Sequence, residues 1–242
     1  MRYTLGDAPL VAKSACRMYP SYAPEFRDRR HAGRSLASVL QAFAESPDTI
    51  VLALPRGGVP VGYEVARLLG LPLDVFTVRK LGVPGQEELA MGAIASGGVR
   101  VLNDEVLWRL PNPEAVISQI AARELGELER REILYRGRRP PLDVAGKTVI
   151  IVDDGLATGA TMRAAVVALR QKGAARIVVA VPVAPIDTFE RFRFDADEVI
   201  CPLLPGDFCS VGQYYQDFSQ TSAGEVSELL ERAANGASDD GG

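Results

Sequence analysis

Short runs of apolar residues alternate along this chain with longer segments in which apolar residues recur every three or four positions. The short runs have the length of buried strands, and the longer segments have the period of helices that bury one face. Strands are predicted at 49–54, 73–78, 147–152, 176–183 and 198–201, and helices at 28–45, 59–69, 113–135, 161–172, 188–194 and 223–234. This alternation predicts an α/β fold with an open, mainly parallel sheet and helices on both faces.

Three stretches depart from this alternation. Residues 81–88 are polar, contain two glycines and a proline, and show no period, so we expect a mobile loop there. Residues 91–95 and 99–102, joined by Ser-Gly-Gly, predict a β-hairpin. Residues 202–220 combine proline, glycine and aromatic residues and predict an irregular segment.

Bulk composition narrows the class of protein. The chain has 242 residues, of which 47% are hydrophobic, enough for a sizeable core. No apolar run approaches the roughly 20 residues that cross a bilayer, and residues 1–10 lack a signal-peptide pattern, so no membrane association is expected. The net charge of −4 offers no global basic field for nucleic acid. Three scattered cysteines favour neither a disulfide framework nor a zinc site, and we expect a reducing, cytoplasmic location.

The most informative segment is residues 149–161, Val-Ile-Ile-Val-Asp-Asp-Gly-Leu-Ala-Thr-Gly-Ala-Thr. A buried strand is followed by the adjacent carboxylates of Asp153 and Asp154, and a loop rich in glycine and threonine then leads into a helix. The loop amides and the helix N-terminus favour a phosphate, and the carboxylates can hold sugar hydroxyls or Mg²⁺. The order of these parts indicates a sugar-phosphate site, with an ordinary strand-to-helix turn as the alternative.

Two further polar groups follow strands of the same predicted sheet. Residues 56–58, Arg-Gly-Gly, follow the strand at 49–54, and Arg79 and Lys80 follow the next strand. Ligands of open α/β sheets bind beyond the carboxyl ends of the strands. We therefore expect both groups on the same rim as the acid pair, although each alone also fits a solvent-exposed turn or strand end.

These segments resemble motifs of the type I phosphoribosyltransferases. Residues 149–161 resemble the family's motif for phosphoribosyl pyrophosphate (PRPP), a hydrophobic strand, two acids and a Thr/Gly-rich loop. Gly155 departs from it, because the family more often has an aliphatic residue after the acids. The Arg-Gly-Gly turn resembles the pyrophosphate loop of purine enzymes. Arg79 and Lys80 resemble a strand end in adenine phosphoribosyltransferases that precedes a mobile loop.

The resemblance implies a role for each group. The 5-phosphate would bind at residues 157–161, the ribose hydroxyls or a bound Mg²⁺ at the acid pair, and the pyrophosphate at the basic residues. The catalytic residues would be Asp153, Asp154, Arg56 and Lys80, and the two aspartates would also be the metal ligands. The substrate-binding residues would be Asp153, Asp154, Gly155, Ala157, Thr158, Gly159, Ala160, Thr161, Arg56, Gly57, Gly58, Arg79 and Lys80.

The resemblance also implies an organisation for the chain. We expect a single phosphoribosyltransferase domain over 1–234, composed of a Rossmann-like core at about 49–201, a small hood from about 20–45 and 202–220, and a helical insertion at about 103–136, followed by a disordered tail at 235–242. In the hood, Phe208 is the best candidate for stacking on a base. The arginine cluster around Arg29 is expected to be a solvated helix face. A homodimer is usual in the family and is expected here.

The implied activity is transfer of ribose 5-phosphate from PRPP to a nitrogenous base, purine-like bases being favoured, with release of pyrophosphate as in purine salvage. A non-catalytic regulator that binds PRPP or a nucleotide is the main alternative. The basic residues on the pyrophosphate side speak against it, because a sensor could lose them. A phosphohydrolase with an aspartate nucleophile is a third hypothesis, but it predicts an Asp-x-Asp pattern, whereas these acids are adjacent.

Overall fold

The computed structural model describes residues 25–109, 111–141 and 143–236. The predicted tail beyond residue 236 and the part of the expected hood before residue 25 lie outside the described residues.

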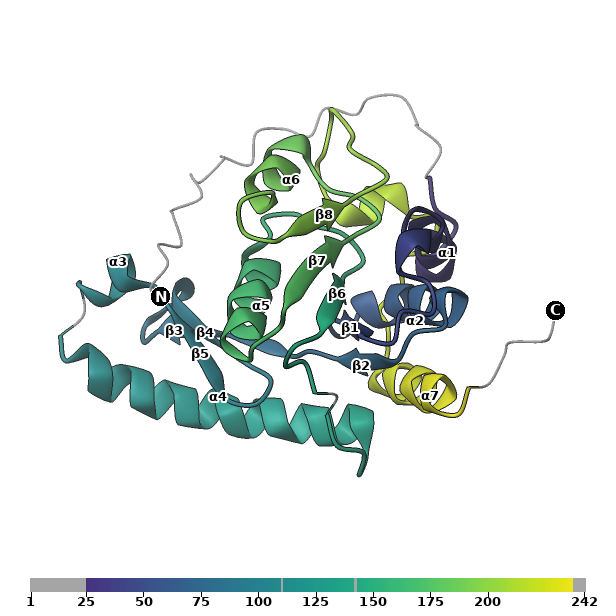
Figure 1. Ribbon diagram of the computed structural model, residues 1–242. Coiled ribbons are helices and arrows are strands. Elements are labelled where there is room, and N and C mark those ends of the chain that lie inside the picture. Colours follow the sequence, from purple (N-terminus) through teal and green to yellow (C-terminus); the bar gives the residue numbers. More distant parts are fainter. Residues whose placement is uncertain (1–24, 110, 142, 237–242) are drawn as a thin grey trace.

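The centre of the fold is a five-stranded sheet in the order β2-β1-β6-β7-β8, with every neighbouring pair parallel (Figure 1). The strands are β1 (Thr49–Ala53), β2 (Leu73–Val75), β6 (Thr148–Val152), β7 (Arg176–Ala180) and β8 (Glu198–Ile200). The predicted open, parallel α/β sheet is confirmed.

Apolar side chains on both faces of the sheet explain why helices cover both faces. Successive strand residues point to opposite faces, and β1 is buried at all five positions. One face packs against α5 and α6, and the other against α1 and α2, as two layers in Figure 1. The helices of this core are α1 (Arg29–Val39), α2 (Gly58–Leu69), α5 (Ala160–Gln171), α6 (Ile186–Phe192) and α7 (Ala223–Ala234), with a short 3₁₀ turn η1 (Gln41–Phe43) after α1.

A second, three-stranded antiparallel sheet interrupts the core. Its strands are β3 (Val78–Val83), β4 (Gln86–Ala95) and β5 (Val99–Leu102). The predicted hairpin of β4 and β5 is confirmed. The mobile loop predicted at 81–88 is wrong, because β3 pairs with β4 as far as Val83 opposite Gln86. Only a tight turn is left, in which Gly85 adopts a positive φ of 76°.

The strand predicted at 73–78 is divided between the two sheets. β2 ends at Val75, and β3 begins at Val78. Thr77 and Ser96 stabilise the segment between the two sheets through two hydrogen bonds. The N–H of Thr77 donates to Ser96 Oγ at 2.7 Å, and the N–H of Ser96 donates to the Thr77 carbonyl at 2.9 Å. Both residues are buried. The chain therefore leaves the central sheet early and carries the next residues into the second sheet.

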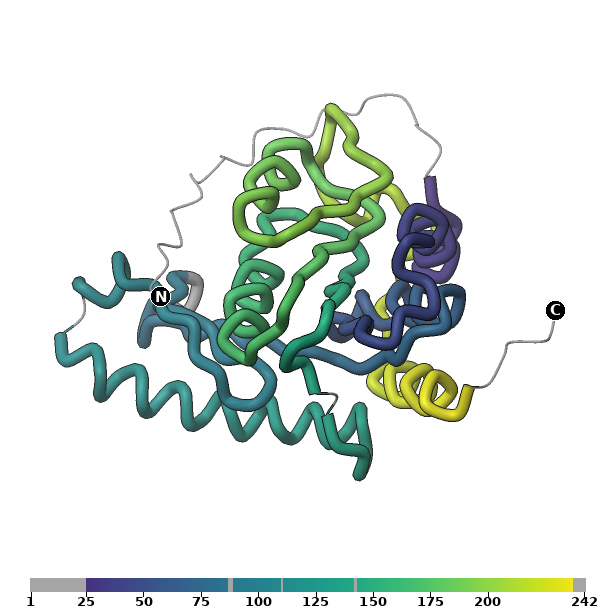
Figure 2. The backbone as a smooth tube through the Cα atoms, in the orientation of Figure 1, coloured from purple at the N-terminus to yellow at the C-terminus, as the bar shows by residue number. Residues whose placement is uncertain are grey.

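The long helix predicted at 113–135 is α4 (Pro113–Arg136), preceded by the short α3 (Asp104–Leu107). α4 packs against the second sheet and runs along one side of the molecule (Figure 2). At its C-terminal end, Arg136 Nε donates to Asp74 of β2, at 2.9 Å to Oδ1 and 3.0 Å to Oδ2. Both side chains are only 7% exposed. This buried pair fixes the end of α4 to the central sheet.

The two segments expected to form the hood meet beyond the sheet. Phe26 and Tyr215 form an isolated parallel bridge. The N–H of Phe26 donates to the Tyr214 carbonyl at 2.9 Å, and the N–H of Gln216 donates to the Phe26 carbonyl at 2.8 Å. Just before Tyr215 the chain makes one 3₁₀ turn, η2 (Val211–Tyr214). Residues from opposite ends of the domain are thereby joined.

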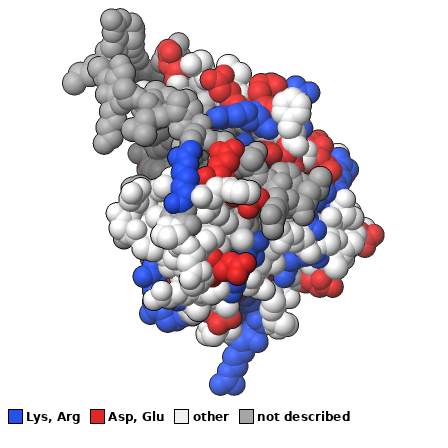
Figure 3. All heavy atoms as spheres, turned by 90° about the vertical axis from the view of Figure 1, so that its left-hand side faces the viewer, with Lys and Arg blue, Asp and Glu red and all other residues white. Residues whose placement is uncertain are grey.

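The surface carries both signs of charge. On the face shown in Figure 3, Lys and Arg side chains are interspersed with Asp and Glu side chains rather than separated from them. Within the described residues, no helix combines the length and the apolar character needed to span a membrane.

We predict that Asp74→Ala destabilises the protein strongly. The substitution removes the carboxylate that accepts from Nε of the buried Arg136 and leaves only Glu132, at 3.5 Å, beside the guanidinium; breaking such a buried pair costs about 3–5 kcal/mol of the free energy of unfolding. Urea unfolding measures the change. Asp48→Ala is the control, because Asp48 is exposed, and it should cost under about 0.5 kcal/mol. Equal stability of the two variants would contradict the role of the pair.

Candidate functional site

The acid pair lies at the carboxyl end of β6. Asp153 and Asp154 directly follow Val152, the last residue of the strand, and both are half-buried. Asp153 Oδ1 accepts a hydrogen bond from the N–H of Asp154 at 2.9 Å. The pair therefore sits where the regular strand gives way to the loop, on the rim that binds ligands in open α/β sheets.

The Arg-Gly-Gly turn packs directly on this acid pair. β1 and β6 are neighbours, with Ala53 opposite Val152, so their carboxyl ends lie together. A Cβ atom added to Gly57 would overlap Asp154 Oδ2, and one added to Gly58 would lie 2.9 Å from Asp153 Cα. Because only glycine permits this approach, the structure brings these two predicted groups into contact. The peptide bond between Pro55 and Arg56, just before the glycines, is cis.

Burial raises the pKa of both carboxyl groups. For Asp153, burial is the main cause and the charge of Asp154 adds to it, so the pKa lies well above its usual value. Burial also raises the pKa of Asp154, while the guanidinium of Arg29 opposes the shift. Two crowded carboxylates are costly to ionise, and a bound cation or hydroxyl donor would relieve that cost. Such a pair is a candidate functional site.

Arg29 is a site residue that sequence reasoning missed. Its Nε donates to Asp154 Oδ2 at 2.8 Å, and its Nη1 donates to the Ser219 carbonyl at 2.7 Å. The guanidinium also lies 4.0 Å from the ring centroid of Phe218. Arg29 was expected to be solvated, but its side chain is only 12% exposed. No sequence pattern distinguishes Arg29 from the other arginines of its cluster. The fold of the hood brings its side chain to the acid pair.

Tyr215 is the second hood residue that contacts the acid pair. Its hydroxyl donates to the Asp154 carbonyl at 2.6 Å. Tyr215 is 4% exposed, and burial raises the pKa of its hydroxyl, which therefore stays protonated as a donor. Arg29 and Tyr215 together hold Asp154 from the hood side.

The predicted phosphate loop leads into α5. Gly159, at the start of the helix, has φ 74°, and no side chain caps the helix there. The first amides of a helix lack intrahelical acceptors and favour an anion. Thr158 and Thr161 are exposed at this start. Behind the loop, Thr188 Oγ1 donates to the Ala157 carbonyl at 2.9 Å and holds the loop. These residues can surround a phosphate.

The hood explains the unusual Gly155. A Cβ atom added there would lie 2.7 Å from Val211 Cγ1 and 3.1 Å from Val183 Cγ1. Val211 belongs to η2 of the hood, so the hood occupies the space that an aliphatic side chain at 155 would need. The departure from the family pattern is therefore a packing adjustment between the loop and the hood.

Arg79 and Lys80 lie on β3, in the second sheet. Arg79 Nε and Nη2 are each 2.6 Å from Glu124 Oε2 of α4. The guanidinium of Arg79 is thus paired within the second sheet and its helix, with a carboxylate that Arg123 shares. Lys80 is exposed. The expectation that Arg79 and Lys80 follow a strand of the central sheet is therefore wrong, because both residues lie within β3 of the second sheet.

The hood aromatics contact one another. Phe208 stacks on Tyr214 with ring centroids 5.6 Å apart, and Tyr215 lies 5.0 Å from Phe218 and 5.3 Å from Phe26. One face of Phe208 is therefore already covered. Its role as a base-stacking ring stays a prediction.

The fold and the site together define an α/β protein with a glycine- and threonine-rich loop beside a half-buried acid pair. Comparison with known protein families agrees with this description. The family model "Phosphoribosyl transferase domain" matches residues 28–217. The chain belongs to this family. It is 49% identical over 208 residues to "Putative phosphoribosyl transferase Rv0571c" of Mycobacterium tuberculosis H37Rv, and equally to the counterpart MT0597 of strain CDC 1551.

The relatives differ in length. The matched region covers 86% of this chain but 47% of each mycobacterial protein, so the chain spans about half the length of these curated relatives. The crystal structure of TT1426 from Thermus thermophilus is 45% identical, with a TM-score of 0.76 over 85% of this chain and 97% of that one. This similarity extends to nearly the whole of a solved chain.

We predict that Gly155→Ala destabilises the protein and that Val211→Ala rescues it. The added methyl group meets Val211, and overpacking of this kind costs about 1–3 kcal/mol of the free energy of unfolding. In a double-mutant cycle followed by urea unfolding, the second substitution should recover most of the loss that the first causes. Additive losses would show that the contact does not explain the glycine.

We predict that Asp153→Asn raises the melting temperature of the ligand-free protein at neutral pH. The folded-state pKa is raised, so the carboxylate charge destabilises the fold above that pKa, and protonation restores stability as the pH falls through it. A gain of about 1 kcal/mol would raise Tm by about 2–4 °C. The difference from the wild type should shrink as the pH is lowered. An unchanged or lower Tm at neutral pH would contradict this.

Proposed function

We propose that the protein transfers ribose 5-phosphate from PRPP to a nitrogenous base, purine-like bases being favoured, and releases pyrophosphate. The observation that carries the proposal is the contact between the Arg-Gly-Gly turn and the acid pair, where Gly57 meets Asp154 and Gly58 meets Asp153. A ligand at this contact faces a phosphate loop on one side and a basic turn on the other. PRPP has a phosphate at one end, a pyrophosphate at the other and a diol between them.

Each part of the substrate has a matching group. The amides and hydroxyls of residues 157–161 bind the 5-phosphate, and Asp153 and Asp154 bind the ribose hydroxyls or the metal on them. Arg56 faces the pyrophosphate: it is half-buried and forms no ion pair with a carboxylate in the described part of the chain. Holding all three parts at once orients C1 of the ribose, which is a main source of rate in such reactions.

Mg²⁺ fits the acid pair. The two carboxylates offer hard oxygen ligands, and no group of three or more acidic, histidine or cysteine side chains that could hold a metal occurs among the described residues. Mg²⁺ is commonly held by one or two carboxylates together with substrate oxygens and water. When bound, it would neutralise charge on the substrate. The raised pKa of Asp153 also favours a cation at this place.

The reaction needs no nucleophile from the protein. Departure of pyrophosphate leaves positive charge on the ribose, as in glycoside hydrolysis. The residues of the site orient the ribose, bind the leaving group and exclude water. The acceptor approaches from the hood, which contacts the acid pair through Arg29 and Tyr215. The homodimer and the cytoplasmic location expected from the sequence stay predictions.

A PRPP-binding regulator differs from the enzyme in turnover alone. It would bind PRPP with Mg²⁺ but release no pyrophosphate with any base. A panel of purine and pyrimidine bases, assayed for pyrophosphate release, separates the two hypotheses, and binding without turnover across the panel would favour the regulator.

We predict that Asp153→Asn combined with Asp154→Asn abolishes PRPP binding and pyrophosphate release while the protein stays folded. Arg56→Ala should lower the rate about a hundredfold, the effect of losing about 3 kcal/mol of transition-state stabilisation. Asp48→Asn, on the exposed surface, is the control and should behave as the wild type. Near-normal PRPP affinity in the double variant would refute the assignment of the acid pair.

A further inference from the structure

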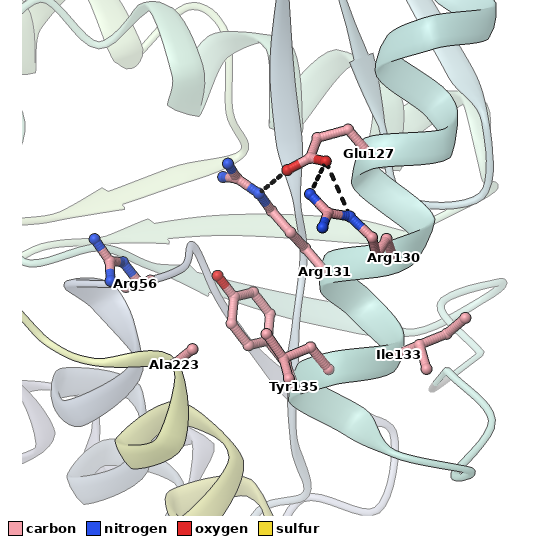
Figure 4. Close-up of a pocket in the computed structure, with 8 residues that line it drawn as sticks. Arg56, Glu127, Arg130, Arg131, Ile133, Tyr135 and Ala223 are labelled. Carbon is pink, nitrogen blue, oxygen red and sulfur yellow. Dashed lines mark hydrogen bonds and ion pairs between the residues drawn. The ribbon is translucent and has the colours of Figure 1, made fainter.

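A pocket of about 620 Å³ lies between the Arg56 turn, the C-terminal half of α4 and the start of α7. Figure 4 shows Arg131 and Tyr135 pointing from α4 toward the side on which Arg56 lies, whereas Ile133 points away. The volume is within the range of small-molecule sites. Arg56 belongs both to this pocket and to the turn that contacts the acid pair, so the pocket continues the proposed site.

The pocket is rich in positive charge. Three guanidinium groups line it, those of Arg56, Arg130 and Arg131, against the single carboxylate of Glu127. Arg131 Nε donates to Glu127 Oε1 at 2.8 Å, and Arg130 Nε donates to Glu127 Oε2 at 3.1 Å. The hydrogen bonds from Arg130 and Arg131 lower the pKa of Glu127, which stays ionised. One anion with two oxygens therefore already bridges the two arginines.

The end of α4 that carries these arginines is held in place. Arg136, at the end of the helix, is paired with Asp74 of β2 in the central sheet. Tyr135 is 4% exposed and lines the pocket. Arg130 and Arg131 are 77% and 45% exposed and can change rotamer. The pocket thus has a fixed backbone and guanidinium groups that solvent can reach.

Arg79 was expected to bind the pyrophosphate, but its guanidinium has another partner. Its guanidinium pairs with Glu124 of α4, which also pairs with Arg123, and Arg79 is not among the residues that line the pocket. A doubly phosphorylated leaving group needs several donors, and guanidinium groups match phosphate oxygens in a fork geometry. Arg130 and Arg131 are the guanidinium groups that share a pocket with Arg56.

We propose that α4 completes the pyrophosphate site: Arg130 and Arg131 bind the pyrophosphate group opposite Arg56, and Glu127 holds both guanidinium groups until that group replaces it. This inference rests on the proposed function, because it assigns one end of the proposed substrate. It also gives the long helix a role in binding.

Isothermal titration with inorganic pyrophosphate and Mg²⁺ tests the inference. Arg130→Ala and Arg131→Ala should each weaken pyrophosphate binding about tenfold, the loss of roughly one charged hydrogen bond. Glu127→Gln keeps the shape but removes the competing charge, so it should tighten binding about threefold. The control is Arg193→Ala: Arg193 pairs with Glu190 at the same i,i+3 spacing, next to α6, and does not line the pocket. It should bind as the wild type does.

Titration with ribose 5-phosphate separates this inference from the proposed function. Its affinity should be the same in the wild type and in the Arg130 and Arg131 variants, because it occupies the other end of the site. Pyrophosphate affinity that is equal in all the variants would overturn the inference and leave the proposed function intact. A third outcome is that ribose 5-phosphate does not bind, whereas pyrophosphate binds with the expected dependence on the arginines. That result would contradict the proposed function and would support the pyrophosphate site at Arg130 and Arg131.

Discussion

The site depends on one close contact, between two glycines of the Arg-Gly-Gly turn and a pair of half-buried aspartates. Gly57 and Gly58 lie against Asp154 and Asp153 so closely that a Cβ atom at either position would collide with them. The contact exists because β1 and β6 are parallel neighbours whose carboxyl ends coincide. It places the turn that carries Arg56 against the acid pair, directly before the glycine- and threonine-rich loop that leads into α5.

The hood stabilises that contact from the other side. Arg29 neutralises Asp154 and Tyr215 binds its carbonyl, although the two residues come from opposite ends of the domain. Val211 fills the space above Gly155. Burial and the neighbouring charge of Asp154 leave Asp153 with a raised pKa, although the guanidinium of Arg29 opposes that shift. Ionising Asp153 therefore costs free energy in the ligand-free protein, and a bound cation or diol can relieve that cost. An unfavourable charge of this kind is typical of a binding site.

The central sheet and the adjacency of the two glycine-containing loops could be predicted from the sequence, because each strand is an apolar run and parallel strands share a rim. The second sheet was only half predicted: Pro84 and Gly85 form a turn, as their residue types suggest, but pairing of β3 with β4 draws Gly82 and the residues from Gln86 onward into strands. The contact of Arg29 with Asp154 and the pairing of Arg79 with Glu124 could not be predicted, because both join distant segments.

A crystal structure of the protein with PRPP and Mg²⁺ tests the central claim most directly. The account predicts the 5-phosphate at the start of α5, the ribose hydroxyls or the metal at Asp153 and Asp154, and the pyrophosphate beside Arg56. A sugar phosphate bound away from the contact between the Arg-Gly-Gly turn and the acid pair would contradict it.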